Sequence, residues 1–153
     1  MAIDPVDSKS GLAKQFGATH FVKPEDIEGV KNEVTAGEGF DYVLECVGHP
    51  ATIRQCYDLA RRGGTAVVVG VGRLTEEVKF NAFELFYGDK TLKGSLFGGA
   101  NVRVDFPKLL RLWKSGKLDL EGMITRRMPV DDINEAFRAM QAGEVIRSVI
   151  DFK

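Results

Sequence analysis

Met1-Ala2-Ile3-Asp4 is a short apolar run closed by an acidic residue, a pattern typical of a buried β-strand with a polar tip. Further along the chain, short runs rich in β-branched and aromatic residues alternate with segments of helical periodicity. The expected strands cover residues 19–22, 40–45, 65–71, 78–80, 91–97, 123–128 and 146–152. This alternation predicts an α/β fold in which helices cover the faces of a parallel sheet.

The segments between these strands have the spacing of amphipathic helices. Residues 7–16 form one such segment, and another is expected to end at Gly63-Gly64. Two later helices carry a single apolar stripe each, and we expect both stripes to be buried in the core. The stripes consist of Phe106, Leu109, Leu110 and Trp113, and of Ile133, Ala136, Phe137 and Met140.

Composition excludes several classes of partner. The 153 residues are 44% hydrophobic, which is enough apolar surface for a globular core. A net charge of -1, with acids and bases interspersed, gives no field that would attract nucleic acid or an anionic membrane. No apolar stretch approaches the roughly 18 residues that span a bilayer, and no leader pattern follows Met1. We therefore expect a cytoplasmic protein with no nucleic acid or membrane partner.

Metal binding is not expected from this chain. Its two cysteines form no CxxC pair. Cys46 stands in an apolar, strand-like run and Cys56 in a helix-like run, so we expect both to be core thiols. Only His20 and His49 are available to help them, and a zinc site of three or four protein ligands does not assemble from such a set.

The acid at position 4 has a particular meaning in βαβ units that bind dinucleotides. In such a unit a carboxylate at the tip of the second strand accepts hydrogen bonds from the adenosine ribose, and a glycine-rich turn lies roughly 20 residues earlier. No glycine-rich turn precedes Asp4 among these residues. The sequence therefore indicates the second half of a nicotinamide-dependent enzyme. We expect a partial Rossmann-like doubly wound parallel sheet that lacks its first βα unit, followed by a C-terminal segment.

A series of short motifs carries a family resemblance through its order and spacing. The motifs are Ala2-Ile3-Asp4, Phe16-Gly17-Ala18-Thr19, Phe40-Asp41-Tyr42-Val43-Leu44-Glu45-Cys46-Val47-Gly48, Gly63-Gly64, Val69-Gly70-Val71, Lys93-Gly94-Ser95-Leu96-Phe97-Gly98-Gly99 and Ile146-Arg147-Ser148. Together they closely resemble the C-terminal half of zinc-dependent medium-chain alcohol dehydrogenases, most of all the branch with class III, thiol-adduct-oxidising members. The resemblance implies an incomplete NAD-binding domain over residues 1–97 and a segment, 98–153, that returns to the catalytic domain.

The resemblance also implies roles for residues around the adenosine half of NAD. Asp4 matches the acid that accepts the ribose 2'-hydroxyl and repels a 2'-phosphate, so NAD is preferred over NADP. Lys9 matches a lysine at the same ribose, and His49 matches a position against the adenine, with Val47 assigned to the same site. The simpler interpretations are a solvated strand-end acid, an exposed helix lysine and a plain residue at a helix N-terminus.

The remaining implied roles concern the nicotinamide, the pyrophosphate and the substrate. Val69, Val71 and Phe97 match positions whose main-chain groups orient the carboxamide, although the two valines also suit a sheet core. Arg147 matches an arginine that reaches the pyrophosphate, where a guanidinium makes bidentate contacts, and its simpler interpretation is a surface salt bridge. Leu96 matches a residue that walls the alcohol pocket.

No catalytic residue is assigned within this chain. The catalytic zinc, the proton relay and the glycine turn of full-length relatives all belong to segments that precede the part matched here, so zinc is expected only in a full-length parent. We expect the chain alone to be inactive. Loss of the central first strand predicts one of three outcomes: the remaining strands close up, another chain fills the space, or the fragment folds poorly.

The resemblance further implies a homodimer through the edge Val78, Lys79 and Phe80, aided by the aromatic helix around residues 83–86. Three other functions stay open at this stage. The first is a non-catalytic dinucleotide-binding or oligomerisation module. The second is an S-adenosylmethionine methyltransferase, whose fold also places an acid after its second strand. The third is a zinc-free quinone or enoyl reductase of the same superfamily.

Overall fold

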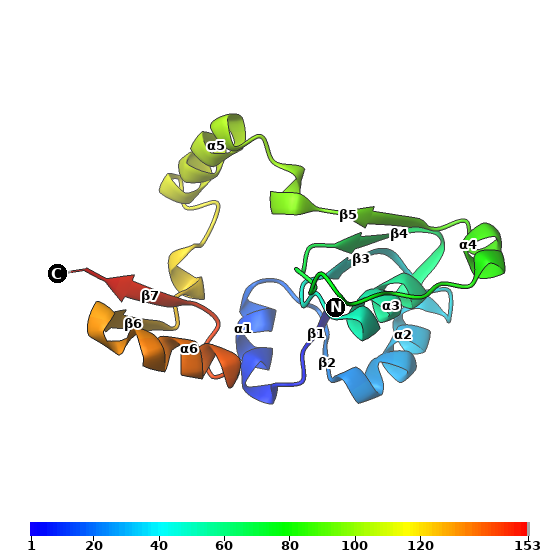
Figure 1. Ribbon diagram of the computed structural model, residues 1–153, viewed down its shortest axis with the longest axis horizontal. Coiled ribbons are helices and arrows are strands. Elements are labelled where there is room, and N and C mark those ends of the chain that lie inside the picture. Colours follow the sequence, from blue (N-terminus) through cyan, green and yellow to red (C-terminus); the bar gives the residue numbers. More distant parts are fainter. Residues whose placement is uncertain (153) are drawn as a thin grey trace. The chain divides into compact units, whose positions relative to one another are not determined.

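The chain folds into two compact α/β units, Met1–Ala100 and Asn101–Lys153. A computed structural model describes residues 1–152 (Figure 1). Every strand pair in the described chain is parallel. The predicted class, a partial Rossmann-like parallel fold, is therefore confirmed.

The first unit alternates strands and helices in the order that the sequence predicts. The unit also contains short 3-10 turns at Asp7–Lys9 (η1), Pro24–Asp26 (η2) and Leu96–Gly99 (η3). Its strands and helices are β1 (Ala2–Ile3), α1 (Ser10–Gln15), β2 (Phe21–Val22), α2 (Ile27–Thr35), β3 (Phe40–Glu45), α3 (Pro50–Leu59), β4 (Ala60–Val68), α4 (Ala82–Gly88) and β5 (Thr91–Gly94).

The strands of this unit form two separate sheets. β1 pairs with β2, whereas β3, β4 and β5 form a three-stranded sheet in that order. No ladder joins β1 to β3 within residues 1–152, so the two sheet edges face each other unpaired. Of the three outcomes expected for the absent central strand, closure of the remaining strands is therefore wrong.

Two small clusters of buried side chains hold the first unit together. Val22, Ile27 and Leu59 form one of them, which joins β2 and α2 to the end of α3. Cys56, Tyr57 and Ala66 form the other, between α3 and β4. Because α3 contributes to both clusters, it connects the three-stranded sheet to the β1–β2 pair.

Predictions about local structure at residues 78–80 and at Gly63-Gly64 are wrong. Residues 78–80 form no strand, because an edge strand needs a partner and Phe80 instead packs its ring 5.1 Å from that of Tyr57. The helix predicted to end at Gly63-Gly64 ends at Leu59, and both glycines lie in β4. The pairing of β4 with β3 shifts in register between Phe40 and Tyr42. A Cβ on Gly64 would lie 2.9 Å from the Phe40 carbonyl oxygen, so the two strands approach closely at this glycine.

The second unit contains one parallel strand pair and two α-helices. Its elements are α5 (Val102–Lys114), a 3-10 turn at Glu121–Met123 (η4), β6 (Arg126–Pro129), a second turn at Val130–Asp132 (η5), α6 (Ile133–Gln141) and β7 (Ser148–Asp151). The stripe of α5 is 36 to 54% exposed, and of the stripe of α6 only Ala136 is buried, because Ile133, Phe137 and Met140 are 38 to 59% exposed. The expectation that both stripes are core is therefore wrong for the described residues, apart from Ala136. None of the helices over residues 1–152 is long and apolar enough to cross a lipid bilayer.

Candidate functional site at the carboxyl edge of the sheet

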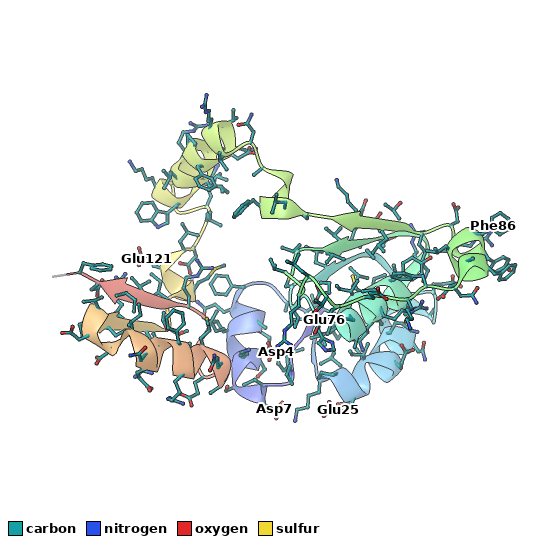
Figure 2. All side chains as sticks on the ribbon, in the orientation of Figure 1. Asp4, Asp7, Glu25, Glu76, Phe86 and Glu121 are labelled. Carbon is teal, nitrogen blue, oxygen red and sulfur yellow. The ribbon has the colours of Figure 1, made fainter. Side chains whose placement is uncertain are left out.

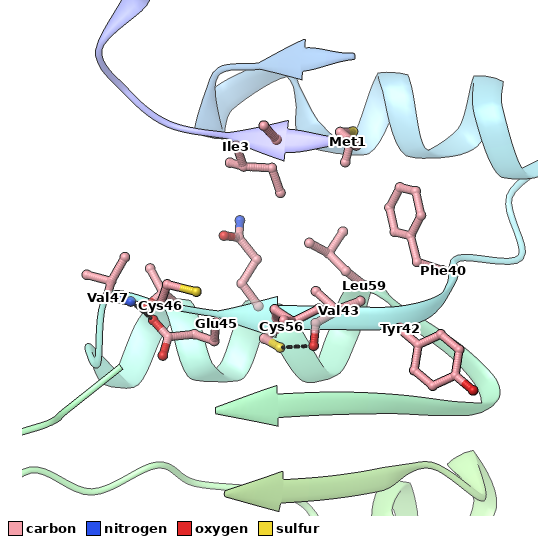
Figure 3. A pocket seen from close by; sticks show the side chains of 14 residues that line it. Met1, Ile3, Phe40, Tyr42, Val43, Glu45, Cys46, Val47, Cys56 and Leu59 are labelled. Carbon is pink, nitrogen blue, oxygen red and sulfur yellow. Dashed lines mark hydrogen bonds between the residues drawn. The ribbon is translucent and has the colours of Figure 1, made fainter. Parts of the chain in front are cut away.

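Apart from Lys9, which lies in η1, the predicted site residues of the first unit lie in the loops and turns that follow parallel strands. Asp4 follows β1, Val47 and His49 lie between β3 and α3, and Val69 and Val71 follow β4. Leu96 and Phe97 follow β5. The strands run in the same direction (Figure 3), so these residues belong to one edge. The carboxyl edge of such a sheet is where ligands bind in open α/β proteins.

Asp4 and Lys9 are brought together at the end of β1. The Lys9 ammonium donates to both carboxylate oxygens of Asp4, at 3.2 and 2.9 Å, and the Val6 amide donates to Oδ1 at 2.9 Å. The Asp4 amide itself donates to the carbonyl of Val22, the last residue of β2. The carboxylate is thus held in place, and its lone pairs beyond these bonds are open to a hydroxyl donor.

Glycines pack the loops after β3 and β4 against each other. Gly48 has a φ of +84°, and a Cβ there would overlap the backbone of Val71. A Cβ on Gly70 would overlap the backbones of Val47 and Gly48. This contact sets the main chain of the second loop beside that of the first, an approach that only glycine permits.

The valines of the second loop are outside the core. Val69 is 39% exposed and Val71 is 89% exposed, so the interpretation that they fill the sheet core is wrong. The amides of Val69 and Gly70 donate to the carbonyl of Glu45, at 2.8 and 3.0 Å. These bonds hold the loop at the end of β3 and leave the valine side chains on the outside.

Glu45 is a polar residue that sequence reasoning missed. It is 4% exposed, and its Oε1 accepts hydrogen bonds from the amides of Val47 and Gly48 and from the Thr52 hydroxyl, at 2.7 to 2.8 Å. Its Oε2 is buried and has no hydrogen-bond partner among the described residues. An acid that ends an apolar strand three residues before a glycine was the signal available in the sequence.

His49 begins α3 as its N-cap residue. Its Nδ1 accepts a hydrogen bond from the Ala51 amide at 3.2 Å. This bond gives a partner to one of the first amides of the helix, which have no acceptor within the helix itself. The side chain is exposed at the carboxyl edge of β3. The simpler interpretation of a residue at a helix N-terminus therefore describes its local role, and a contact with a ligand stays a prediction.

Leu96 and Phe97 lie in a turn instead of the expected strand. β5 ends at Gly94, and Phe97 has a φ of +49°, a left-handed conformation that non-glycine residues adopt rarely. Gly98 and Gly99 follow with φ values of +72° and +67°. The side chains of Leu96 and Phe97 are 81% and 79% exposed, so the turn presents them outward.

Arg147 lies in the second unit, immediately before β7. Its carbonyl accepts a hydrogen bond from the Thr125 amide at 3.0 Å, and its side chain is exposed. The surface salt bridge considered for it does not form with any acid among residues 1–152. Arg147 is the one predicted site residue outside the first unit.

The cysteines differ from each other in environment. Burial raises the pKa of the Cys56 thiol to about 11, and this residue is core as predicted. Cys46 is exposed, so its assignment to the core is wrong, because it follows the last residue of β3. No group of three or more His, Cys, Asp or Glu side chains in the described chain is arranged to hold a metal ion. These residues therefore do not fit a zinc site.

Comparison with known proteins gives one consistent family. The family model for zinc-binding dehydrogenases matches residues 1–115. The S-(hydroxymethyl)glutathione dehydrogenase of Paracoccus denitrificans is 35% identical over 98% of this chain, and the class-3 alcohol dehydrogenase of Drosophila melanogaster is 40% identical over 98%. The benzyl alcohol dehydrogenase of Acinetobacter calcoaceticus superposes over 99% of the chain with a TM-score of 0.90 and 30% identity.

The match covers only part of each relative. The chain spans 42% of the Paracoccus protein, 41% of the Drosophila protein and 42% of the Acinetobacter chain. The resemblance to the class III branch is nevertheless confirmed, because proteins with that name match almost every residue of this chain. The chain therefore belongs to the zinc-binding dehydrogenase family, the zinc-dependent medium-chain alcohol dehydrogenases.

Proposed function

We propose that this chain forms the NAD-holding part of a zinc-type alcohol dehydrogenase that transfers hydride between an alcohol or aldehyde adduct and NAD. The observation that supports the proposal most is the Asp4–Lys9 pair at the carboxyl end of β1, in a chain of this family. The glycine-packed loops after β3 and β4 support it further, because they bring two main-chain segments to the same edge.

Each residue has a defined role in this proposal. Asp4 accepts the adenosine ribose hydroxyls, and Lys9 donates to the same sugar while it holds the carboxylate. Val47 and His49 border the adenine. The main-chain groups of Val69, Val71 and Phe97 orient the nicotinamide carboxamide, Leu96 borders the substrate, and Arg147 pairs with the pyrophosphate through its guanidinium.

In this proposal, residues outside this chain supply the metal chemistry. Residues 1–97 supply cofactor binding, and residues 98–153 belong with the catalytic domain. NAD carries the hydride when bound, and the protein orients it. Because the residues here do not fit a zinc site, we expect the 153 residues alone to show no alcohol oxidation. A cytoplasmic location belongs to the same proposal.

Calorimetric titration of the 153-residue chain with NAD and with NADP tests the cofactor assignment. We expect saturable binding of NAD and weaker binding of NADP, because the Asp4 carboxylate repels a 2'-phosphate. Asp4→Asn should weaken NAD binding and remove the preference between the two cofactors. The matched control is Asp7→Asn, because Asp7 is an exposed acid that pairs with Lys23. Equal preference in the unaltered chain would contradict the proposal.

The same preparation separates the alternative functions. NAD binding without turnover agrees with the expectation for this chain and also fits a non-catalytic dinucleotide-binding module. Addition of a polypeptide that carries the zinc ligands distinguishes the two, because only an enzyme part gains activity. Binding of S-adenosylmethionine would indicate a methyltransferase instead. Quinone reduction by the mixture without zinc would indicate the zinc-free reductase.

We also propose a homodimer through the segment Val78, Lys79 and Phe80, which pairs with no strand among the described residues, and the neighbouring α4. Phe83, Phe86 and Tyr87 are 68%, 80% and 58% exposed on α4, and Figure 2 shows Phe86 projecting outward from this helix. Exposed aromatic clusters of this kind often mark interfaces.

Sedimentation velocity on the chain tests the dimer. We expect Phe86→Glu to give monomers, because a charge would be buried in the interface. Phe80 is unsuitable for this test because its ring packs on the core residue Tyr57. Leu74→Glu is the control, because Leu74 is fully exposed outside the helix. A chain that sediments as a monomer before any substitution would contradict the proposal.

A further inference from the structure

One residue, Glu45, holds the two loops of the candidate site through two different groups. Its carboxylate oxygen Oε1 accepts hydrogen bonds from the amides of Val47 and Gly48 in the loop after β3, and Figure 3 shows the bond from Val47. Its main-chain carbonyl accepts hydrogen bonds from the amides of Val69 and Gly70 in the loop after β4. Both loops are therefore anchored to the last residue of β3.

The side chain of Glu45 holds the first loop from inside the protein. Glu45 is 4% exposed, and its Oε1 accepts a third hydrogen bond, from the hydroxyl of Thr52 in α3. Hydrogen bonds to an ionised carboxylate are stronger than those between neutral groups. If the first loop moved away, the buried carboxylate would lose its donors, which is unfavourable. The first loop is therefore fixed before any ligand binds.

The second loop depends on the first through a contact between glycine backbones. A Cβ on Gly48 would overlap the main chain of Val71, and a Cβ on Gly70 would overlap the main chain of Val47 and of Gly48 itself. Two main chains in such close contact cannot shift independently of each other. The Glu45 carboxylate therefore also influences the position of Val71, through Gly48.

We propose that Glu45 is a positioning residue that sets both loops together, so that one buried carboxylate aligns the adenine side and the nicotinamide side of the cofactor site. The inference rests on the proposed function, in which Val47 borders the adenine and Val71 orients the carboxamide. Loops that are already ordered lose less conformational entropy when a ligand binds, and this raises the affinity. Glu45 acts through these loops and does not itself contact the cofactor.

Hydrogen exchange without cofactor tests the coupling of the two loops. In Glu45→Ala the amides of Val47 and Gly48 lose their acceptor, and we expect them to exchange about tenfold faster or more. The amides of Val69 and Gly70 should also exchange faster, although their acceptor, the Glu45 carbonyl, is still present. Unchanged exchange at Val69 and Gly70 would overturn the inference, whether or not the chain binds NAD.

Two conservative variants at the same position decide the question if Glu45→Ala is poorly folded. Glu45→Gln keeps the oxygen that accepts the three bonds, and Oε2 has no hydrogen-bond partner among the described residues, so this substitution breaks no bond. Glu45→Asp keeps the charge but shortens the side chain by one methylene, which draws the carboxylate away from its donors. We expect exchange of the loop amides to stay near the unaltered rates in Glu45→Gln and to accelerate in Glu45→Asp.

Calorimetric titration with NAD tests the consequence for the cofactor. Glu45→Asp should bind NAD about tenfold more weakly than the unaltered chain, because its loops must be ordered on binding, and Glu45→Gln should stay within about threefold. The ratio of the affinities for NAD and NADP should not change in either variant, because that preference belongs to Asp4. Glu33→Ala, at an exposed acid of α2, is the control.

The outcomes separate this inference from the proposed function. A merely structural role for Glu45 would lower the urea midpoint of unfolding of Glu45→Asp and leave the affinity of the folded chain for NAD unchanged, and that result would overturn the inference. Equal weakening by Glu45→Asp and Glu45→Gln would also overturn it, because the charge and not the reach of the side chain would then matter. Absence of NAD binding by the unaltered chain would contradict the proposed function, and hydrogen exchange would still decide whether Glu45 couples the loops.

Discussion

The two units of this chain differ in what stabilises them. Of the ten buried apolar residues within residues 1–152, seven lie in the first unit, including the large side chains of Ile27, Tyr57 and Leu59. The second unit buries only Met128, Ala136 and Ala139. Because buried apolar area dominates folding free energy, the first unit has a core of its own, and the second has little of one.

The second unit also carries a network of exposed ion pairs. Arg138 donates to Glu135 and Glu144 at 2.7 to 2.9 Å, and all three side chains are about half exposed. Ion pairs in that environment contribute little, since water and salt screen them. The difference in buried core between the two units shows that similar α/β patterns in one sequence can produce units of unequal stability.

The largest expected effect is loss of the first core. Tyr57 is 0% exposed and lies in the cluster with Cys56 and Ala66. Tyr57→Ala should destabilise the first unit by about 3 to 5 kcal/mol, the usual cost of removing a buried aromatic ring. Urea unfolding followed by hydrogen exchange of β3 and β4 measures it. Leu74→Ala, at a fully exposed side chain outside α4, should cost less than about 1 kcal/mol, and equal losses would contradict the comparison.

A smaller effect is expected from adding one methyl group to packed glycines. Gly70→Ala should cost about 1 to 3 kcal/mol, because its Cβ would overlap the backbone of Gly48. Gly11, in α1, has nothing within 4 Å, so Gly11→Ala should stabilise the unit by about 0.4 to 1 kcal/mol. Thermal unfolding of the two variants measures the difference. The same sign in both would mean that the two loops are not in contact.

The second unit should respond to acid through its ion pairs. Hydrogen bonds from Arg138 lower the pKa of Glu135 to about 2, from an ordinary value of 4.5. A lowered folded-state pKa stabilises the unit above pH 4.5, and this contribution is lost as the pH falls towards 2. Arg138→Met should reduce this acid dependence, and added salt should reduce it in the unaltered chain. Exchange of the α6 amides against pH measures both, and an unchanged profile would contradict the assignment.

The smallest effect on stability is expected from thiol labelling at the edge of the first unit. Iodoacetamide should modify the exposed Cys46 and leave the fold intact. Cys56 should stay unmodified, since it is buried and its pKa is about 11. Mass spectrometry of the native chain should show one adduct, and of the unfolded chain two. Rapid modification of Cys56 in the native state would show that the first core is open.

The sequence predicted the order of elements well where the pattern was local. Residues 40–45 form β3 as expected, because alternating and β-branched residues specify a strand without reference to distant groups. Residues 91–97 were predicted as one strand, but the chain leaves the sheet at Gly94. The glycines that follow made a turn available, and pairing with β4 determined where the strand ends.

Burial was predicted less well than secondary structure. The stripe around Leu109 and Trp113 has helical spacing, yet its side chains are partly exposed, since spacing defines a face and not what covers that face. Phe80 was expected at an edge and lies against Tyr57 instead. Such outcomes depend on contacts between residues more than twenty positions apart.

The same distinction, between what local sequence patterns specify and what distant contacts specify, applies to the candidate site. The sequence by itself determined that acids, glycines and short loops follow strands, and it identified the family and the position of Asp4 at a strand end. Only the tertiary structure decided that Gly48 and Gly70 pack together, that Glu45 is buried with one oxygen unpaired, and that β1 and β3 do not pair. The physical reason is that residue spacing encodes local conformation, whereas desolvation and backbone pairing depend on which distant segments meet.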